Sequence, residues 1–189
     1  HMGIYAKGNI DKFDYRLAVN NPGRNGISGN FNGQANPALT YTGVNNVNKE
    51  GDPTGNTVIE GYFRYQLKDT ESIKLPYAVG TYLGTKDILA IGAGFFAHPN
   101  GMYNSNTGEH ENVTHFAADV FIDKPITGGG CLNAYASFMS FNYGEDYVAR
   151  WAGTGTVLYG HVGVLIPGSK VMPYVAYQTG NYDGFADPT

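Results

Sequence analysis

The 189-residue sequence carries little charge, one cysteine, one tryptophan and no long apolar run. A single cysteine, Cys131, excludes an internal disulfide framework. The absence of any stretch of ~18 apolar residues excludes a transmembrane helix. Lysine and arginine do not cluster and the formal net charge is −4, so no surface for nucleic acid is expected.

Tyrosine and glycine are abundant instead, with 15 tyrosines and 27 glycines. Charged residues make up only 15% of the chain, whereas about 25% is usual in a soluble domain. This combination is typical of a protein whose outer surface does not face water. A transmembrane β-barrel fits, because its alternating strands never form a strongly apolar run. We interpret His1 and Met2 as a cloning remnant and 3–189 as one β-barrel domain or an internal part of one.

Alternation with a period of two recurs along the chain, whereas helical periodicity is almost absent. In 13–20, FDYRLAVN, the residues Phe, Tyr, Leu and Val share one face, and Asp, Arg, Ala and Asn share the other. The stretches 61–67, 115–123 and 156–166 alternate in the same way. About eight strands are predicted, from Gly3–Ile10 to Val171–Gly180. The predicted fold is an all-β, antiparallel, up-and-down transmembrane β-barrel, complete or part of a larger barrel.

Short and long connections alternate between the predicted strands, as they do in outer-membrane barrels. The long polar stretches 21–57, 99–113 and 142–155 are predicted to be extracellular, and the turns near Ile10, Pro125 and Gly168 periplasmic. One periplasmic connection is too long, and it contains the apolar stretch 75–84, LPYAVGTYLG. We expect this stretch either to fold back against the rim or mouth of the barrel, or to prolong the following strand.

The block 74–102, KLPYAVGTYLGTKDILAIGAGFFAHPNGM, resembles a segment of the outer-membrane porins of Bacteroidota described as phosphate-selective porin O/P-like. FDYRLAVNNP, GYFRYQLKDTES, FAADVFIDKPI, LNAYASFMSFNYG and VLYGHVGVLIP agree in the same order. The resemblance implies a porin in the outer membrane of a Gram-negative bacterium. Small polar solutes or ions would diffuse passively through its lumen, without enzymatic activity or a cofactor. Because members of the family are longer, it also implies that this chain is a fragment.

The resemblance implies membrane lipid and small polar solutes or anions as partners. A homo-oligomer or a larger outer-membrane complex would also fit a porin. Charged and histidine side chains on the polar faces of the strands are the candidate pore lining: Asp14, Arg16, Glu60, Arg64, His115, Asp119, Asp123 and His161. The alternative is internal ion pairing, of Arg16 with a neighbouring carboxylate and of Arg64 with Glu60 or Asp119. Both signs of charge are nearly balanced, so these residues do not predict a preference for anions.

The stretch 98–115 gathers groups that could bind a metal: His98, Glu109, His110, Glu111 and His115. Their spacing matches no fixed motif, and we interpret them as residues of a solvated loop tip, with no metal. No catalytic motif is present either, so no enzyme is predicted.

Tyrosines near strand ends predict interfacial girdles at a bilayer: Tyr41, Tyr62, Tyr77, Tyr82, Tyr103, Tyr143, Tyr147, Tyr177 and Tyr182, together with Trp151. The alternative for these rings is stacking on sugars. Two other classes of protein therefore remain open. One is a soluble or surface β-sandwich that binds carbohydrate, and the other is a non-conducting barrel that serves as a scaffold in a membrane complex.

Overall fold

The computed structural model describes residues 3–20, 27–28, 38–41, 57–74, 78–149 and 152–185, and this part of the chain is all-β. The long strands are β1 (Gly3–Ile10), β2 (Phe13–Asn20), β5 (Val58–Gln66), β6 (Ile88–Asn104), β7 (Glu109–Ile126), β8 (Gly130–Asn142), β11 (Gly155–Leu165) and β12 (Tyr174–Tyr182). The short strands are β3 (Ile27–Ser28), β4 (Leu39–Tyr41), β9 (Val148–Ala149) and β10 (Ala152–Gly153). Over the described ranges, no helix has the length and apolar character needed to cross a membrane.

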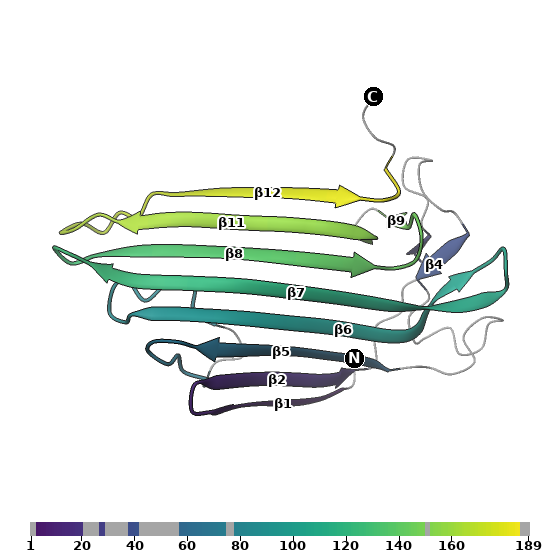
Figure 1. The fold of residues 1–189 in the computed structure, drawn as a ribbon, viewed down its shortest axis with the longest axis horizontal. Helices are drawn as coiled ribbons and strands as arrows, with labels where there is room; N and C mark the ends of the chain where they lie inside the picture. Colours follow the sequence, from purple (N-terminus) through teal and green to yellow (C-terminus); the bar gives the residue numbers. More distant parts are fainter. Residues whose placement is uncertain are drawn as a thin grey trace.

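The long strands form one antiparallel sheet in which neighbours in sequence are neighbours in space. The order is β1-β2-β5-β6-β7-β8-β11-β12, and Figure 1 shows these strands side by side from β1 at the bottom to β12 at the top. The prediction of about eight antiparallel, up-and-down strands is confirmed. The sheet is open, however, because β1 and β12 form its two edges and do not pair within the described residues. The structure therefore contains a sheet and not a closed barrel.

The predicted alternation of short and long connections is followed only in part. The short turns β1–β2 and β7–β8 lie at the left end of the sheet in Figure 1, called here the short-turn end, but the β5–β6 connection at the same end is long and consists of residues 67–87. At the right end, called the long-connection end, β6 and β7 are joined by residues 105–108 alone. The β1–β2 turn consists of Asp11 and Lys12, and Asp11 has a φ of 53°. The β7–β8 turn contains Gly128 and Gly129, with φ values of 82° and 83°. Glycine adopts this left-handed conformation without a steric penalty, which allows the tight reversal.

The loop predicted at 99–113 is wrong, because β6 and β7 continue through most of it as a long hairpin. The register shifts between His98 and Met102 at a bulge, where Asn100 has a φ of 55° and its N–H donates to Asn112 Oδ1 at 2.9 Å. The polar composition of this stretch resembles a loop, although its residues pair across strands. The predicted loop 21–57 contains β3 and β4, and most of its other residues lie outside the described ranges.

The strand register separates the two faces of the sheet. One row of paired residues crosses all eight strands on the apolar face: Gly8, Tyr15, Phe63, Ala93, Ala118, Phe138, Leu158 and Thr179. The next row lies on the opposite, polar face: Asn9, Asp14, Arg64, Gly92, Asp119, Ser137, Tyr159 and Gln178. Adjacent rows face opposite sides because side chains alternate along a strand.

Burial is inverted relative to a water-soluble sheet. On the apolar face, Leu158 is 54% exposed and Ile91 is 50% exposed. On the polar face, the exposed fractions of Asp14 and Arg64 are only 1% and 4%. A conventional apolar core is small and lies at the long-connection end, where it contains Leu39, Met102, Val113, Tyr147 and Ala149. The sheet thus buries its charged side and exposes its hydrophobic side.

Candidate functional site on the polar face

All eight residues predicted as pore lining lie on the polar face. The strands β2, β5, β7 and β11 supply them, and the register places their side chains on the same side of the sheet: Asp14, Arg16, Glu60, Arg64, His115, Asp119, Asp123 and His161. They fall into separate groups with different partners.

An ion-pair cluster joins β2, β5 and the connection that follows β5. Arg64 Nη2 lies 3.6 Å from Asp14 Oδ2, and Arg16 Nε lies 3.4 Å from Asp14 Oδ1. Arg64 Nη1 lies 2.5 Å from Oε2 of Glu71, which is also buried. The expected pairing of Arg16 with a neighbouring carboxylate is confirmed. The pairing of Arg64 with Glu60 or Asp119 is wrong, because Asp14 lies directly opposite Arg64 and Glu71 reaches it from outside the strands.

Glu71 is the residue of this cluster that the sequence did not reveal. It lies in the polar run DTES of an irregular connection, where no strand period marks the direction of a side chain. Its backbone N–H donates to the Oε1 atom of Gln66, and its carboxylate accepts a hydrogen bond of 2.9 Å from Tyr82 Oη. These contacts fix the carboxylate over the polar face.

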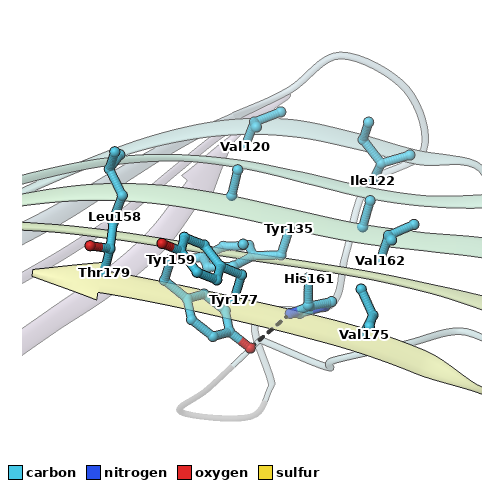
Figure 2. Close-up of a pocket in the computed structure, with 13 residues that line it drawn as sticks. Val120, Ile122, Tyr135, Leu158, Tyr159, His161, Val162, Val175, Tyr177 and Thr179 are labelled. Carbon is cyan, nitrogen blue, oxygen red and sulfur yellow. Dashed lines mark hydrogen bonds between the residues drawn. The ribbon is translucent and has the colours of Figure 1, made fainter.

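A chain of hydrogen bonds extends from β11 across β8 to Asp123 on β7. Tyr159 Oη lies 3.1 Å from His161 Nδ1, and His161 Nε2 lies 3.1 Å from Asn133 Oδ1. Figure 2 shows Tyr159 and His161 joined on this side of the sheet. Asn133 Nδ2 donates to Asp123 Oδ2 at 2.9 Å, and Thr81 Oγ1 donates to the same oxygen at 2.8 Å. Asp123 is fully buried, so these donors replace the water that a carboxylate requires.

A glycine makes room for the third group. Tyr62 Oη donates to Asp119 Oδ1 at 3.1 Å directly above Gly92. A Cβ atom at position 92 would lie 2.2 Å from Tyr62 Oη and 2.6 Å from Asp119 Oδ2. Tyr62 therefore belongs to the polar face, and its assignment to an interfacial girdle is wrong.

Aromatic rings dominate the polar face near the long connections. The His115 ring stacks on Phe96 with a centroid distance of 4.9 Å and lies 4.5 Å from the Tyr143 ring. Tyr143 also contacts Tyr41 and Tyr147. Burial and the neighbouring Tyr143 raise the pKa of Tyr41 to about 12. Glu60, the remaining predicted residue, accepts a hydrogen bond from Asn20.

The candidate metal ligands do not come together. His98 is bonded to Tyr41 Oη, and His110 Nδ1 lies 3.2 Å from the Asn100 carbonyl oxygen. The side chain of Glu111 accepts from Asn104, and His115 lies among aromatic rings. Throughout the described part of the chain, no group of three or more His, Cys, Asp or Glu residues could hold a metal ion.

The connection between β5 and β6, residues 67–87, is called here the folded-back segment. Its described parts, 67–74 and 78–87, cover the polar face near the short turns. Besides Glu71 and Thr81, the carbonyl oxygen of Gly80 accepts from Asn133 Nδ2 at 2.9 Å. Within the segment, Lys86 Nζ donates to the Thr70 carbonyl oxygen at 2.6 Å. This placement agrees with the fold-back hypothesis for 75–84. Leu75, Pro76 and Tyr77 lie outside the described residues, as does Trp151.

The opposite, apolar face carries a shallow groove of about 570 Å³ across β7, β8, β11 and β12. Its floor contains the small residues Ala134, Ala136 and Gly160. Figure 2 shows Leu158 and Val162 on the side of the sheet opposite the Tyr159–His161 pair. Apolar side chains make up most of the lining of the groove, with Thr179 and Tyr177 adding hydroxyl groups from β12, so the groove is suited to apolar chains.

Comparison with protein-family models, with curated proteins and with solved structures finds no match for this chain.

Proposed function

We propose that this chain forms the wall of an outer-membrane β-barrel of the porin type, through which small polar solutes or ions diffuse passively. The observation that carries the proposal is the inverted burial. Exposed apolar side chains from all eight long strands share one face, and the buried charged side chains Asp14, Arg64 and Asp123 lie on the opposite face. A transmembrane barrel wall needs this distribution, because its outer surface contacts lipid and its inner surface contacts the lumen.

Exposure of the apolar face to water would be unfavourable. Soluble monomers rarely expose contiguous apolar patches of more than a few hundred Å². Here the exposed apolar side chains extend from Ile4 on β1 to Val175 on β12. Acyl chains would cover this surface without competing for hydrogen bonds, since the strands satisfy one another's backbone groups.

The polar face would let small polar solutes and ions pass because it is polar. It would not strongly prefer one sign of charge. Arg16 and Arg64 are both paired with carboxylates, so their positive charge is compensated. The resemblance to phosphate-selective porins of Bacteroidota agrees with the barrel wall. Selectivity for phosphate is not supported, because carboxylates already pair with both arginines of this cluster.

A non-conducting scaffold barrel is the second candidate, and the folded-back segment is the observation that favours it. Contacts of Glu71 and Thr81 hold this segment over the polar face and fill space that a solute would use. A carbohydrate-binding β-sandwich has less support. In the described residues, the only sheet besides the large one is the pair β9–β10, of two residues each, so no second layer packs against the apolar face.

Two measurements test the proposal. The purified chain should require detergent to remain monodisperse, and a stable monomer in aqueous buffer would exclude the membrane assignment. Planar-bilayer recordings of the chain in its native assembly should then show discrete conductance steps. Membrane insertion without conductance would favour the scaffold.

Leu158→Arg tests the lipid contact of the apolar face. Arginine at the bilayer midplane costs a β-barrel about 2–4 kcal/mol, so this variant should insert into vesicles less completely than the wild type. Leu83→Arg is the matched control, because Leu83 is equally exposed, at 55%, but lies in the folded-back segment outside the strands. Equal insertion of both variants would contradict contact between this face and lipid.

A further inference from the structure

We propose that Arg64 is a carboxylate-binding site of the polar face, and that Glu71 of the folded-back segment is its internal occupant. Acidic solutes would then compete with the segment for the same guanidinium group. The inference rests on the proposed function, because the solute must reach the polar face.

The geometry of Arg64 carries the first step. Its side chain is 3% exposed, and the two terminal nitrogens lie close to different carboxylates, Nη2 to Asp14 and Nη1 to Glu71. Asp14 belongs to the neighbouring strand and is directly opposite in the register, so it is a fixed part of the sheet. Glu71 belongs to an irregular connection, so its carboxylate can leave without disturbing the strand pairing.

The charge balance carries the second step. With Glu71 in place, ion pairs join the guanidinium groups of Arg16 and Arg64 to the carboxylates of Asp14 and Glu71. Withdrawal of Glu71 removes the nearer of the two carboxylates of Arg64, which lies at 2.5 Å, whereas Asp14 lies at 3.6 Å. An unpaired buried charge is unfavourable, so a carboxylate from solution would be drawn to the position that Glu71 left. Arginine suits this exchange because it remains charged and its terminal nitrogens can donate to two different carboxylates, so Nη1 accepts a new partner while Nη2 stays beside Asp14.

Hydrogen bonds hold the described parts of the segment against the sheet. Thr81 Oγ1 donates to Asp123, the Gly80 carbonyl oxygen accepts from Asn133, and Lys7 Nζ donates to the Lys74 carbonyl oxygen. Within the segment, Tyr82 Oη donates to Glu71. Each of these bonds has a modest net strength, so the segment can leave the sheet without the loss of strand pairing. A tethered occupant of this kind lowers the apparent affinity for a free competitor to the intrinsic affinity multiplied by the fraction of time that the site is empty.

The experiment measures acetate binding to the full chain in detergent micelles, by line broadening of the acetate methyl resonance, with sodium chloride replacing sodium acetate at constant ionic strength. Glu71→Gln should bind acetate at least about tenfold more tightly than the wild type, which corresponds to ~1.4 kcal/mol. Glu109→Gln is the matched control, because it removes one negative charge at the exposed hairpin end. It should bind acetate as the wild type does.

Addition of Arg64→Gln to Glu71→Gln should abolish the gain. A Glu71→Gln variant that binds no better than the Glu109→Gln control would overturn the proposal. If Glu71→Gln does not fold, Tyr82→Phe provides the second test, because it removes one bond to Glu71 and keeps the charge. It should accelerate tryptic cleavage after Lys74 and Lys86, and acetate should accelerate that cleavage more than chloride does. Cleavage that is equally fast in both salts would also overturn it.

Acetate binding in micelles does not require conduction. Failure of the proposed function would therefore appear as absent conductance steps, whereas failure of this inference would appear as unchanged acetate binding.

Discussion

At the scale of single residues, Gly92 on the polar face leaves the space in which two larger side chains form a hydrogen bond. Gly92 lies between Arg64 and Asp119 in the register, with no side chain of its own. Tyr62 crosses this space to reach Asp119. Because a hydrogen-bonded tyrosine and carboxylate fill the volume, position 92 has no room even for a methyl group.

Gly92→Ala should destabilise the protein for this reason. The added Cβ would overlap Tyr62 Oη and Asp119 Oδ2, and overpacking of this kind costs about 1–3 kcal/mol. The free energy of unfolding, measured by urea titration in micelles, checks the expectation. Gly80→Ala is the control, because no atom lies within 4 Å of a Cβ built there. Similar losses in the two variants would show that Tyr62 and Asp119 move aside readily.

At the scale of elements, alternation in the sequence predicted the strands and their faces well. Phe63 and Arg64 are neighbours in the chain and lie on opposite faces, as the period of two requires. The same rule placed Asp119 and His161 on one face, although they are far apart in sequence. It works because a strand leaves each side chain only two directions.

The period-two alternation could not predict the contacts of residues that lie outside regular strands. Glu71 reaches Arg64 because the described residues of the folded-back segment, 67–74 and 78–87, lie over the sheet, and nothing in the local sequence fixes that placement. The hairpin around Asn104 and Glu109 was missed for a related reason. Its His, Asn and Glu residues have the composition of a loop, and their pairing depends on the strands that precede them.

The folded-back segment should detach as the pH rises above the ordinary range of tyrosine. Burial, followed by the hydrogen bond and charge of Glu71, raises the pKa of Tyr82 above its usual value of 10.0. The neutral phenol is therefore favoured in the folded protein. Its contribution to stability is complete below a pH of about 10 and is lost as the pH rises through the elevated pKa.

Hydrogen exchange of the amides in 78–87 should accordingly accelerate at high pH more than base catalysis alone explains, with exchange in β7 as the internal reference. Tyr82→Phe should remove the additional acceleration. If Tyr82→Phe shows the same acceleration as the wild type, ionisation of Tyr82 does not control the segment.

At the scale of the whole molecule, the two ends of the sheet differ in character. The hairpin tip at Asn106 belongs to the long-connection end, and the β11–β12 turn at Lys170 belongs to the short-turn end. If the sheet spans a membrane, these two positions face different compartments.

A cysteine at each position tests that arrangement. Cys131 is fully buried and is replaced by serine to give a background without other thiols. In intact cells, an impermeant thiol reagent should label Asn106→Cys, because the long connections of outer-membrane barrels are extracellular and Asn106 lies at the same end of the sheet as the β8–β11 connection. Lys170→Cys should be labelled only after the outer membrane is permeabilised. Labelling of both positions in intact cells would show that the sheet does not cross the membrane as proposed.

The even number of long strands has a consequence for assembly. Each strand reverses the direction of the one before it, so β1 and β12, the first and last in the order, run in opposite directions. An antiparallel ring that contains this sheet can therefore be completed directly or by an even number of added strands. An odd number would force one parallel seam. A fully antiparallel barrel that contains this sheet must therefore have an even number of strands, whether the remaining strands come from the same polypeptide or from another copy.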